Sequence, residues 1–149
     1  MEIKRLGPIG AEIKDLDLTN FNEQESNQIK NSFLEYSVLV FRNQMLNPEQ
    51  LKSISTLWGE PLVHPVFKGI DGHPEIIEIK NFGEKYHTNA HWHSDVTFED
   101  SPPDATLLYS IVVPDEGGDT LFSSQHLAYN GLDSKLKSDL ADKVAVHSN

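Results

Sequence analysis

The sequence contains no cysteine and few basic residues, and both absences narrow the chemistry available to the chain. Without cysteine there is no disulfide scaffold, no thiolate zinc site and no cysteine nucleophile. The 12 lysines and arginines are outnumbered by 23 aspartates and glutamates, so the net charge is −11 and we expect no nucleic-acid partner. No segment approaches the roughly 18 apolar residues of a membrane span, and none resembles a signal-peptide core. We therefore expect a cytoplasmic protein without a membrane partner.

Turn residues and apolar spacing predict two strands followed by an amphipathic helix. The strands are expected over 2–6 and 11–18, separated by the turn-forming pair Gly7-Pro8. Asn22 is a candidate N-cap, and glutamates follow it in the first turn, where the helix dipole favours acids. The predicted buried stripe of this helix, at the spacing i, i+4 and i+7, consists of Ile29, Phe33 and Tyr36.

A second strand–helix pair follows, and the remaining segments alternate between strands and loops. Residues 38–41 form a continuous apolar run and predict a strand buried on both faces. Asn47, Pro48 and Gly59 mark the cap, first position and end of a second helix. The other predicted elements are strands over 76–79, 106–113 and 119–122, and helices over 124–130 and 134–143. This order predicts one α+β domain over 1–149 with a mostly antiparallel sheet.

Two long irregular stretches, 61–74 and 81–90, lie between these elements. Loops of such length in a compact domain are usually functional or disordered. Directly after them comes His91-Trp92-His93-Ser94-Asp95. In an extended segment, i and i+2 point to one face, so His93 and Asp95 can converge on one ion. They would supply two ligands of the facial triad that holds non-haem Fe(II). An ordinary His–Asp hydrogen bond is the alternative.

Several segments, taken in order along the whole chain, resemble the taurine dioxygenase family (TauD/TfdA-like Fe(II)/2-oxoglutarate-dependent dioxygenases). The most specific are WHSDVTF at 92–98 and GGDTLFSS at 117–124. Weaker matches lie at 40–44, 59–61, 64–66 and 101–103. The resemblance covers essentially the whole chain and ends where proteins of this family would continue for about as many residues again, which suggests the N-terminal half alone.

The resemblance implies a fold, an activity and a set of site residues. The fold would be a double-stranded β-helix (jelly roll) with flanking helices, incomplete at the C-terminus. The activity would be hydroxylation of a small organic acid, such as a taurine-like sulfonate, with O2 and 2-oxoglutarate. His93 and Asp95 would bind Fe(II), and Thr120 would bind the distal carboxylate of 2-oxoglutarate. His64 and Asn89 would contact the substrate. No residue of the chain is expected to act as a catalytic acid, base or nucleophile.

Each of these residues also has an ordinary structural alternative. Thr120 is a β-branched residue in a predicted strand, and Thr favours strands. His64 and Asn89 lie in loops, where His and Asn residues often serve turns and caps. Phe67 departs from the family pattern, because it stands where a tyrosine hydroxyl would help hold a sulfonate.

The second histidine ligand and the arginine that pairs with 2-oxoglutarate belong, in the resembled family, to the second half. The last residues, 143–147, resemble the beginning of another strand. We therefore expect a truncated dioxygenase that is weakly active or inactive alone. Two alternatives remain open. One is a non-catalytic, cupin-like module that binds zinc or copper through His91, His93 and Asp95. The other is a split protein that completes its barrel with another chain or a second copy, as a homo-oligomer.

Overall fold

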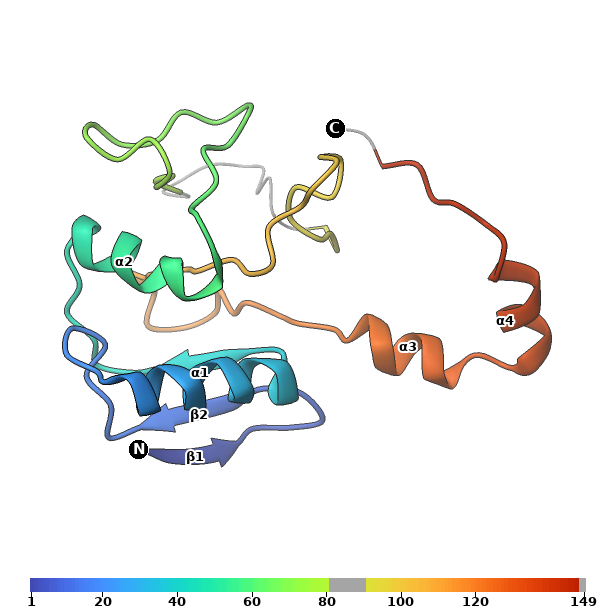
Figure 1. Cartoon of the computed structure of the whole chain (residues 1–149), viewed down its shortest axis with the longest axis horizontal. Coiled ribbons are helices and arrows are strands. Elements are labelled where there is room, and N and C mark those ends of the chain that lie inside the picture. Colours follow the sequence, from blue (N-terminus) through green and yellow to red (C-terminus); the bar gives the residue numbers. More distant parts are fainter. Residues whose placement is uncertain (81–90, 148–149) are drawn as a thin grey trace. The chain divides into compact units, whose positions relative to one another are not determined.

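The computed structural model describes residues 1–80 and 91–147, and the chain divides into two compact units. The first unit consists of residues 1–45 and 110–146. The second consists of the described part of 46–109 together with His147. Figure 1 shows the chain from its N-terminus in blue to its C-terminus in red. Asn89 and the second irregular stretch, 81–90, lie outside the described residues.

The first unit begins with a three-stranded sheet of β1 (Glu2–Arg5), β2 (Ala11–Lys14) and β3 (Leu39–Phe41). The strand order is β1-β2-β3, with β1 antiparallel and β3 parallel to β2, so this sheet is mixed rather than mostly antiparallel. Strand β2 ends before the predicted position 18 because Asp15 adopts a left-handed φ of 54°. Strand β3 lies at an edge of the sheet and is half-buried, so the prediction of burial on both faces was wrong: each of its three side chains stays partly exposed.

Helix α1 (Glu23–Tyr36) packs beside this sheet (Figure 1). Its Ile29 side chain is fully buried. Asn22 caps the helix as predicted: its side chain accepts from the Glu25 N–H, and the Glu25 carboxylate accepts from the Asn22 N–H. The helix ends at Ser37, whose φ of 64° is left-handed. The buried apolar residues of this unit are Ala11, Ile13, Leu16, Leu18 and Ile29.

The side-chain amide of Gln44 joins the loops that follow β2 and β3. Its Oε1 accepts a hydrogen bond from the Leu18 N–H at 2.9 Å, and its Nε2 donates to the Leu16 carbonyl at 3.0 Å. One amide therefore satisfies a donor and an acceptor of the same loop, as half-buried backbone groups require.

The second unit is organised around helix α2 (Pro48–Ser55), which continues as the 3-10 turn η1 (Thr56–Trp58). Asn47 and Gln50 form a second capping box, and Pro48 occupies the first turn, as the sequence predicted. Gly59 ends the element with a φ of 123°, a value that only glycine adopts readily. Ile54 is the buried apolar residue of α2, with 4% of its surface exposed.

A compact turn over 69–76 replaces the strand predicted at 76–79. The Ile70 N–H donates to the Ile76 carbonyl at 2.9 Å, and the Ile76 N–H donates to the His73 carbonyl at 3.1 Å. Because both backbone groups of Ile76 bond within the turn, this residue cannot join a sheet. The strand prediction was therefore wrong here.

The predicted C-terminal helices are confirmed, whereas the predicted strands between 106 and 122 are not formed. Helix α3 (Gln125–Gly131) begins at the N-cap Ser124 and α4 (Ser134–Leu140) at the N-cap Asp133. Apolar side chains of the preceding stretch are exposed, for example Ile111 at 80%. A strand needs a hydrogen-bonded partner, and none pairs with this stretch among the described residues. Apart from an isolated bridge between Ile70 and His73, the three-stranded sheet is the β-structure of the described residues, so the double-stranded β-helix stays a prediction. The described helices include none with the length and apolarity to cross a bilayer.

Candidate metal centre

His93 and Asp95 face each other in the second unit. The imidazole Nε2 of His93 lies 3.2 Å from Oδ1 of Asp95, and the side chains are 51% and 45% exposed. The i and i+2 spacing therefore does bring the two groups together, although Asp95 begins a turn rather than continuing a strand. An ion from solvent can reach both atoms.

A backbone contact determines which nitrogen of His93 carries a proton. Nδ1 of His93 lies 2.7 Å from the carbonyl oxygen of His91. A carbonyl can only accept, so Nδ1 is the N–H donor. In the neutral imidazole, Nε2 then carries the lone pair and faces Asp95. This is the arrangement in which metal-bound histidines are usually held, with the remote nitrogen donating to a carbonyl or carboxylate.

The other oxygen of Asp95 is held by Thr106. The Thr106 hydroxyl donates a hydrogen bond of 2.8 Å to Oδ2 of Asp95 across eleven residues of sequence. The two carboxylate oxygens of Asp95 are therefore distinct, because Oδ2 accepts from a protein group and Oδ1 faces His93.

The residue after Asp95 has an unfavourable backbone conformation. Val96 has a φ of 53°, in the left-handed region, where a β-branched side chain is a genuine outlier. The Val96 carbonyl accepts from the Glu99 N–H at 3.1 Å and closes a turn there. Backbone strain of this kind often accompanies functional sites. The chain therefore changes direction immediately after Asp95.

The donor atoms of this pair fit a metal ion. Nε2 of a neutral His93 and Oδ1 of an ionised Asp95 are both acceptors, and at 3.2 Å they repel unless a positive charge lies between them. A proton on Nε2 would satisfy them as an ordinary ion pair. A metal ion would do so equally, since adjacent ligands on an ion with bonds of about 2.1 Å lie about 3 Å apart.

No third side-chain ligand joins the pair within residues 1–80 and 91–147, where no group of three His, Cys, Asp or Glu side chains can hold a metal. The alternative site of His91, His93 and Asp95 is therefore not assembled. His91 contributes its backbone carbonyl to the arrangement.

His64 lies in the same unit and is oriented by its own loop. Its Nδ1 accepts from the backbone N–H groups of Val66 and Phe67, each at 3.0 Å. The neutral tautomer therefore carries its proton on Nε2, which becomes the donor. The imidazole also stacks in a tilted arrangement on Phe67, with ring centroids 4.8 Å apart, and meets Phe98 edge-on at 6.5 Å. Phe98 follows Asp95 by three residues, so His64 lies beside the segment that carries the pair.

Thr120 belongs to the first unit and is exposed. It follows a glycine pair, Gly117 and Gly118, which both have left-handed φ values, 75° and 72°. A side chain on Gly118 would also press against Pro114, because an added Cβ would lie 3.1 Å from its ring. Both glycines are therefore required by the backbone in the stretch before Thr120.

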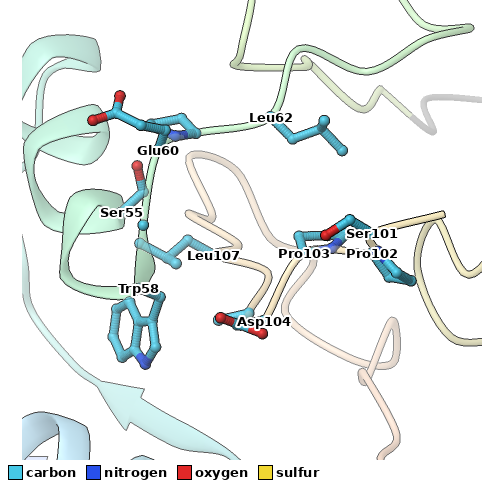
Figure 2. Close-up of a pocket in the computed structure, with 12 residues that line it drawn as sticks. Ser55, Trp58, Glu60, Leu62, Ser101, Pro102, Pro103, Asp104 and Leu107 are labelled. Atoms are coloured by element: carbon cyan, nitrogen blue, oxygen red, sulfur yellow. The ribbon is translucent and has the colours of Figure 1, made fainter. Parts of the chain in front are cut away.

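A shallow cleft of about 260 Å³ lies beside the end of α2 and η1 (Figure 2). Trp58, Leu62, Pro103 and Leu107 are among the residues that line it, and Leu107 lies close to Ser55 and Trp58. Thr106 lies between two residues that line this cleft, so the segment that borders it also supplies the hydroxyl that binds Asp95.

Three features of the segment around the pair were not predicted from the sequence. Thr106 carries no motif signal, and its contact with Asp95 depends on the chain folding back. His147 lay outside the matched motifs, yet its Nδ1 lies 2.7 Å from the Thr97 hydroxyl. The left-handed φ of Val96 has no sequence signature, because valine disfavours it.

Comparison with known proteins identifies the chain's relatives. Residues 2–149 match the family described as "Taurine catabolism dioxygenase TauD, TfdA family". The chain is 35% identical to the "Alkylsulfatase" of Acinetobacter baylyi, with all of the chain and 47% of that protein covered. It is also 35% identical to the "Alpha-ketoglutarate-dependent sulfate ester dioxygenase" of Pseudomonas putida, with 96% and 48% covered.

A solved structure agrees with these matches. The crystal structure of a taurine dioxygenase from Burkholderia xenovorans superposes with a TM-score of 0.83 at 37% identity, covering 95% of this chain and 51% of that one. The chain thus spans about half the length of the relatives it matches. From the match over residues 2–149, the chain belongs to the TauD, TfdA family of taurine catabolism dioxygenases.

Proposed function

We propose that this chain forms part of an Fe(II)- and 2-oxoglutarate-dependent dioxygenase that hydroxylates a small organic sulfate or sulfonate. The observation that carries the proposal is the pair His93 and Asp95, whose Nε2 and Oδ1 atoms lie 3.2 Å apart. In the neutral imidazole both atoms are lone-pair donors accessible from solvent, because the His91 carbonyl accepts from the opposite nitrogen of His93. Imidazole and carboxylate are the ligands of the facial triad.

In this proposal His93 and Asp95 hold the iron, and Thr120 binds the distal carboxylate of 2-oxoglutarate. The third protein ligand and a cation for 2-oxoglutarate come from further residues of the protein or from another chain. The complete fold is a double-stranded β-helix. The relatives it resembles span about twice this length, which supports a site built from more than these residues.

Bound iron would supply the activation of O2, with 2-oxoglutarate providing two of the electrons. One oxygen atom enters the substrate C–H bond and the other enters succinate, while the 2-oxo acid loses CO2. If the hydroxylated carbon bears a sulfate ester, the C–O bond to sulfate breaks and an aldehyde remains. The chain's own residues bind and orient the reactants, and none is required as an acid or base.

His64 is proposed to bind the sulfate group. With Nδ1 occupied by the Val66 and Phe67 N–H groups, its Nε2–H is left as a donor for an anionic oxygen. Asn89 is proposed as a second donor. Phe67 contributes an apolar ring beside His64 and has no hydroxyl. An alkyl sulfate, whose chain is apolar, therefore suits this surface. Two relatives named for sulfate esters or alkyl sulfates support this choice.

Anaerobic titration of the chain with Fe(II) and 2-oxoglutarate tests the proposal. Chelated cosubstrate gives a weak visible charge-transfer band, which we expect for the wild type and not for His93→Ala or Asp95→Ala. Asp104→Ala, an exposed acid that lines the neighbouring cleft, is the matched control and should retain the band. The proposed cofactors would be contradicted if the folded wild-type chain gives no band, either alone or mixed with the part of a relative that this chain does not match.

A further inference from the structure

Asp95 makes a contact that the proposed chemistry does not use. The Thr106 hydroxyl lies 2.8 Å from Oδ2, while Oδ1 is the atom that faces His93. Thr106 is exposed, so this hydrogen bond is not required to satisfy a buried group. Hydrogen bonds to a charged acceptor are shorter and stronger than neutral ones, which makes this contact directional even at the surface.

Thr106 lies outside the turn that carries Asp95, so its hydrogen bond reaches the carboxylate from another segment of the chain. Thr106 follows Pro102-Pro103, and its neighbour Leu107 lines the cleft beside Trp58 (Figure 2). A proline pair fixes two φ angles and stiffens the segment. The hydroxyl therefore restrains the carboxylate from outside the strained turn at Val96.

We propose that Thr106 is a positioning residue that holds Oδ2 of Asp95 so that Oδ1 alone is presented to the metal. The inference rests on the proposed function, since it needs a metal ion at the pair. Without the hydroxyl, the carboxylate can rotate about its Cβ–Cγ bond and offer either oxygen, or both. A fixed carboxylate leaves more positions of the ion open to other ligands.

The contact at Asp95 matches the one at His93. The His91 carbonyl orients the imidazole from one side, and the Thr106 hydroxyl orients the carboxylate from the other. Each proposed ligand thus has one oriented outer contact, the arrangement that tunes metal affinity in characterised sites. The contact to His93 comes from the backbone and cannot be removed by substitution, but the contact from Thr106 can.

Thr106→Val removes the hydroxyl at nearly constant shape, and Thr106→Ser keeps a hydroxyl. We expect Thr106→Val to lower the affinity for Co(II) or Mn(II) about 10- to 100-fold, measured by calorimetry on the full chain. Thr106→Ser should retain affinity within about threefold of the wild type, well inside that range. Thr56→Val is the matched control, because its hydroxyl bonds to the Ser53 carbonyl within a helical turn at 2.6 Å. Its affinity should not change.

A spectroscopic readout separates positioning from a general loosening of the fold. The metal-induced infrared difference spectrum reports the separation of the two carboxylate stretching bands, which differs between one-oxygen and two-oxygen binding. We expect Thr106→Val to shift this separation and Thr106→Ser to restore it. Should Thr106→Val fail to fold, Thr106→Ala offers the same readout without the β-branched side chain.

Different results would overturn the positioning role of Thr106 and the metal centre itself. Metal binding by the wild type with unchanged affinity and carboxylate bands in Thr106→Val would overturn the positioning role and leave the metal centre standing. A wild-type chain that binds Co(II) and Mn(II) no better than Asp95→Ala would overturn the metal centre and this inference with it. Weaker binding and shifted bands in Thr106→Val, both restored in Thr106→Ser, support the proposal.

Discussion

Nζ of Lys52 lies 3.0 Å from Oε1 of Glu75, and this ion pair fastens the turn at 69–76 to helix α2. Only 6% of the Glu75 side chain is exposed, so its carboxylate depends on this cation. Nδ1 of His73 lies 3.7 Å from the same oxygen. The contact therefore joins an ammonium group to a nearly buried carboxylate.

We expect Lys52→Met to make the stability of the second unit less dependent on pH. The Glu75 N–H and the Lys52 ammonium hold the pKa of Glu75 below its usual value, and Glu75 raises the pKa of Lys52. A lowered carboxyl pKa stabilises the fold above the unfolded value of about 4.3, and this is lost as pH falls through the folded value. A raised lysine pKa stabilises the fold below the unfolded value of about 10.4, and this stabilisation is lost as pH rises through the folded value.

Thermal unfolding measured from pH 3 to 9 checks this. The melting temperature of Lys52→Met should fall furthest below the wild type between about pH 5 and 9, where both groups are charged. The gap should narrow below the folded pKa of Glu75. Lys14→Met is the control, because Lys14 pairs with Glu2 at an exposed position. Equal melting curves for the two variants at every pH would refute the role of the buried pair.

Gly69→Ala should destabilise the same turn by about 1–3 kcal/mol, the usual cost of overpacking. An added Cβ would lie 2.6 Å from the His73 carbonyl oxygen and would also clash with the Pro74 carbonyl, and neither backbone group can rotate away. Gly131→Ala is the matched control, since its Cβ would meet no heavy atom within 4 Å beyond its own helix. It should be neutral or stabilising by up to about 1 kcal/mol. Urea unfolding that gives both variants the same free energy would contradict the clash.

The helices were predictable because their signals are local. Asn22 and Asn47 each cap a helix through contacts three residues away, and the proline at position 48 fixes the first turn of α2. The strands expected over 106–113 and 119–122 failed for the opposite reason. Apolar β-branched residues indicate strand propensity, but a strand also needs a partner that local sequence does not specify.

In the candidate site, too, the local contact was predictable from the sequence and the longer-range contact was not. The pairing of His93 with Asp95 follows from a spacing of two residues and was predictable. The contact of Thr106 with Asp95 spans eleven residues and depends on the path of an irregular loop. The left-handed φ of Val96 runs against its residue type, so propensity predicts the wrong conformation there.

That strain at Val96 leads to a prediction with opposite effects on stability and binding. Val96→Gly removes the Cβ that disfavours a φ of 53° and should raise the free energy of unfolding by about 1 kcal/mol. The turn becomes less restrained, so metal affinity at Asp95 should fall. Val113→Gly is the control at an exposed position without positive φ, and it should lose about 0.5–1 kcal/mol from backbone entropy. If Val96→Gly is destabilised as much as this control, the strain is absent.

His64 can be tested for anion binding without disturbing its loop. The Oδ1 atom of an asparagine can accept the Val66 and Phe67 N–H groups that Nδ1 of His64 accepts, in the manner of an Asx turn. His64→Asn therefore keeps the turn and replaces the Nε2–H donor with an amide Nδ2 that ends one bond short of the Nε2 position, whereas His64→Ala removes both. We expect both variants to bind hexyl sulfate about tenfold more weakly, as the loss of one hydrogen bond to a charged group implies. NMR titration of the backbone amides of 64–67 gives both the affinity and the state of the turn. Hexyl sulfate affinity that survives in His64→Asn but not in His64→Ala would assign His64 to the architecture of the loop, and the anion would then have to be bound by other donors.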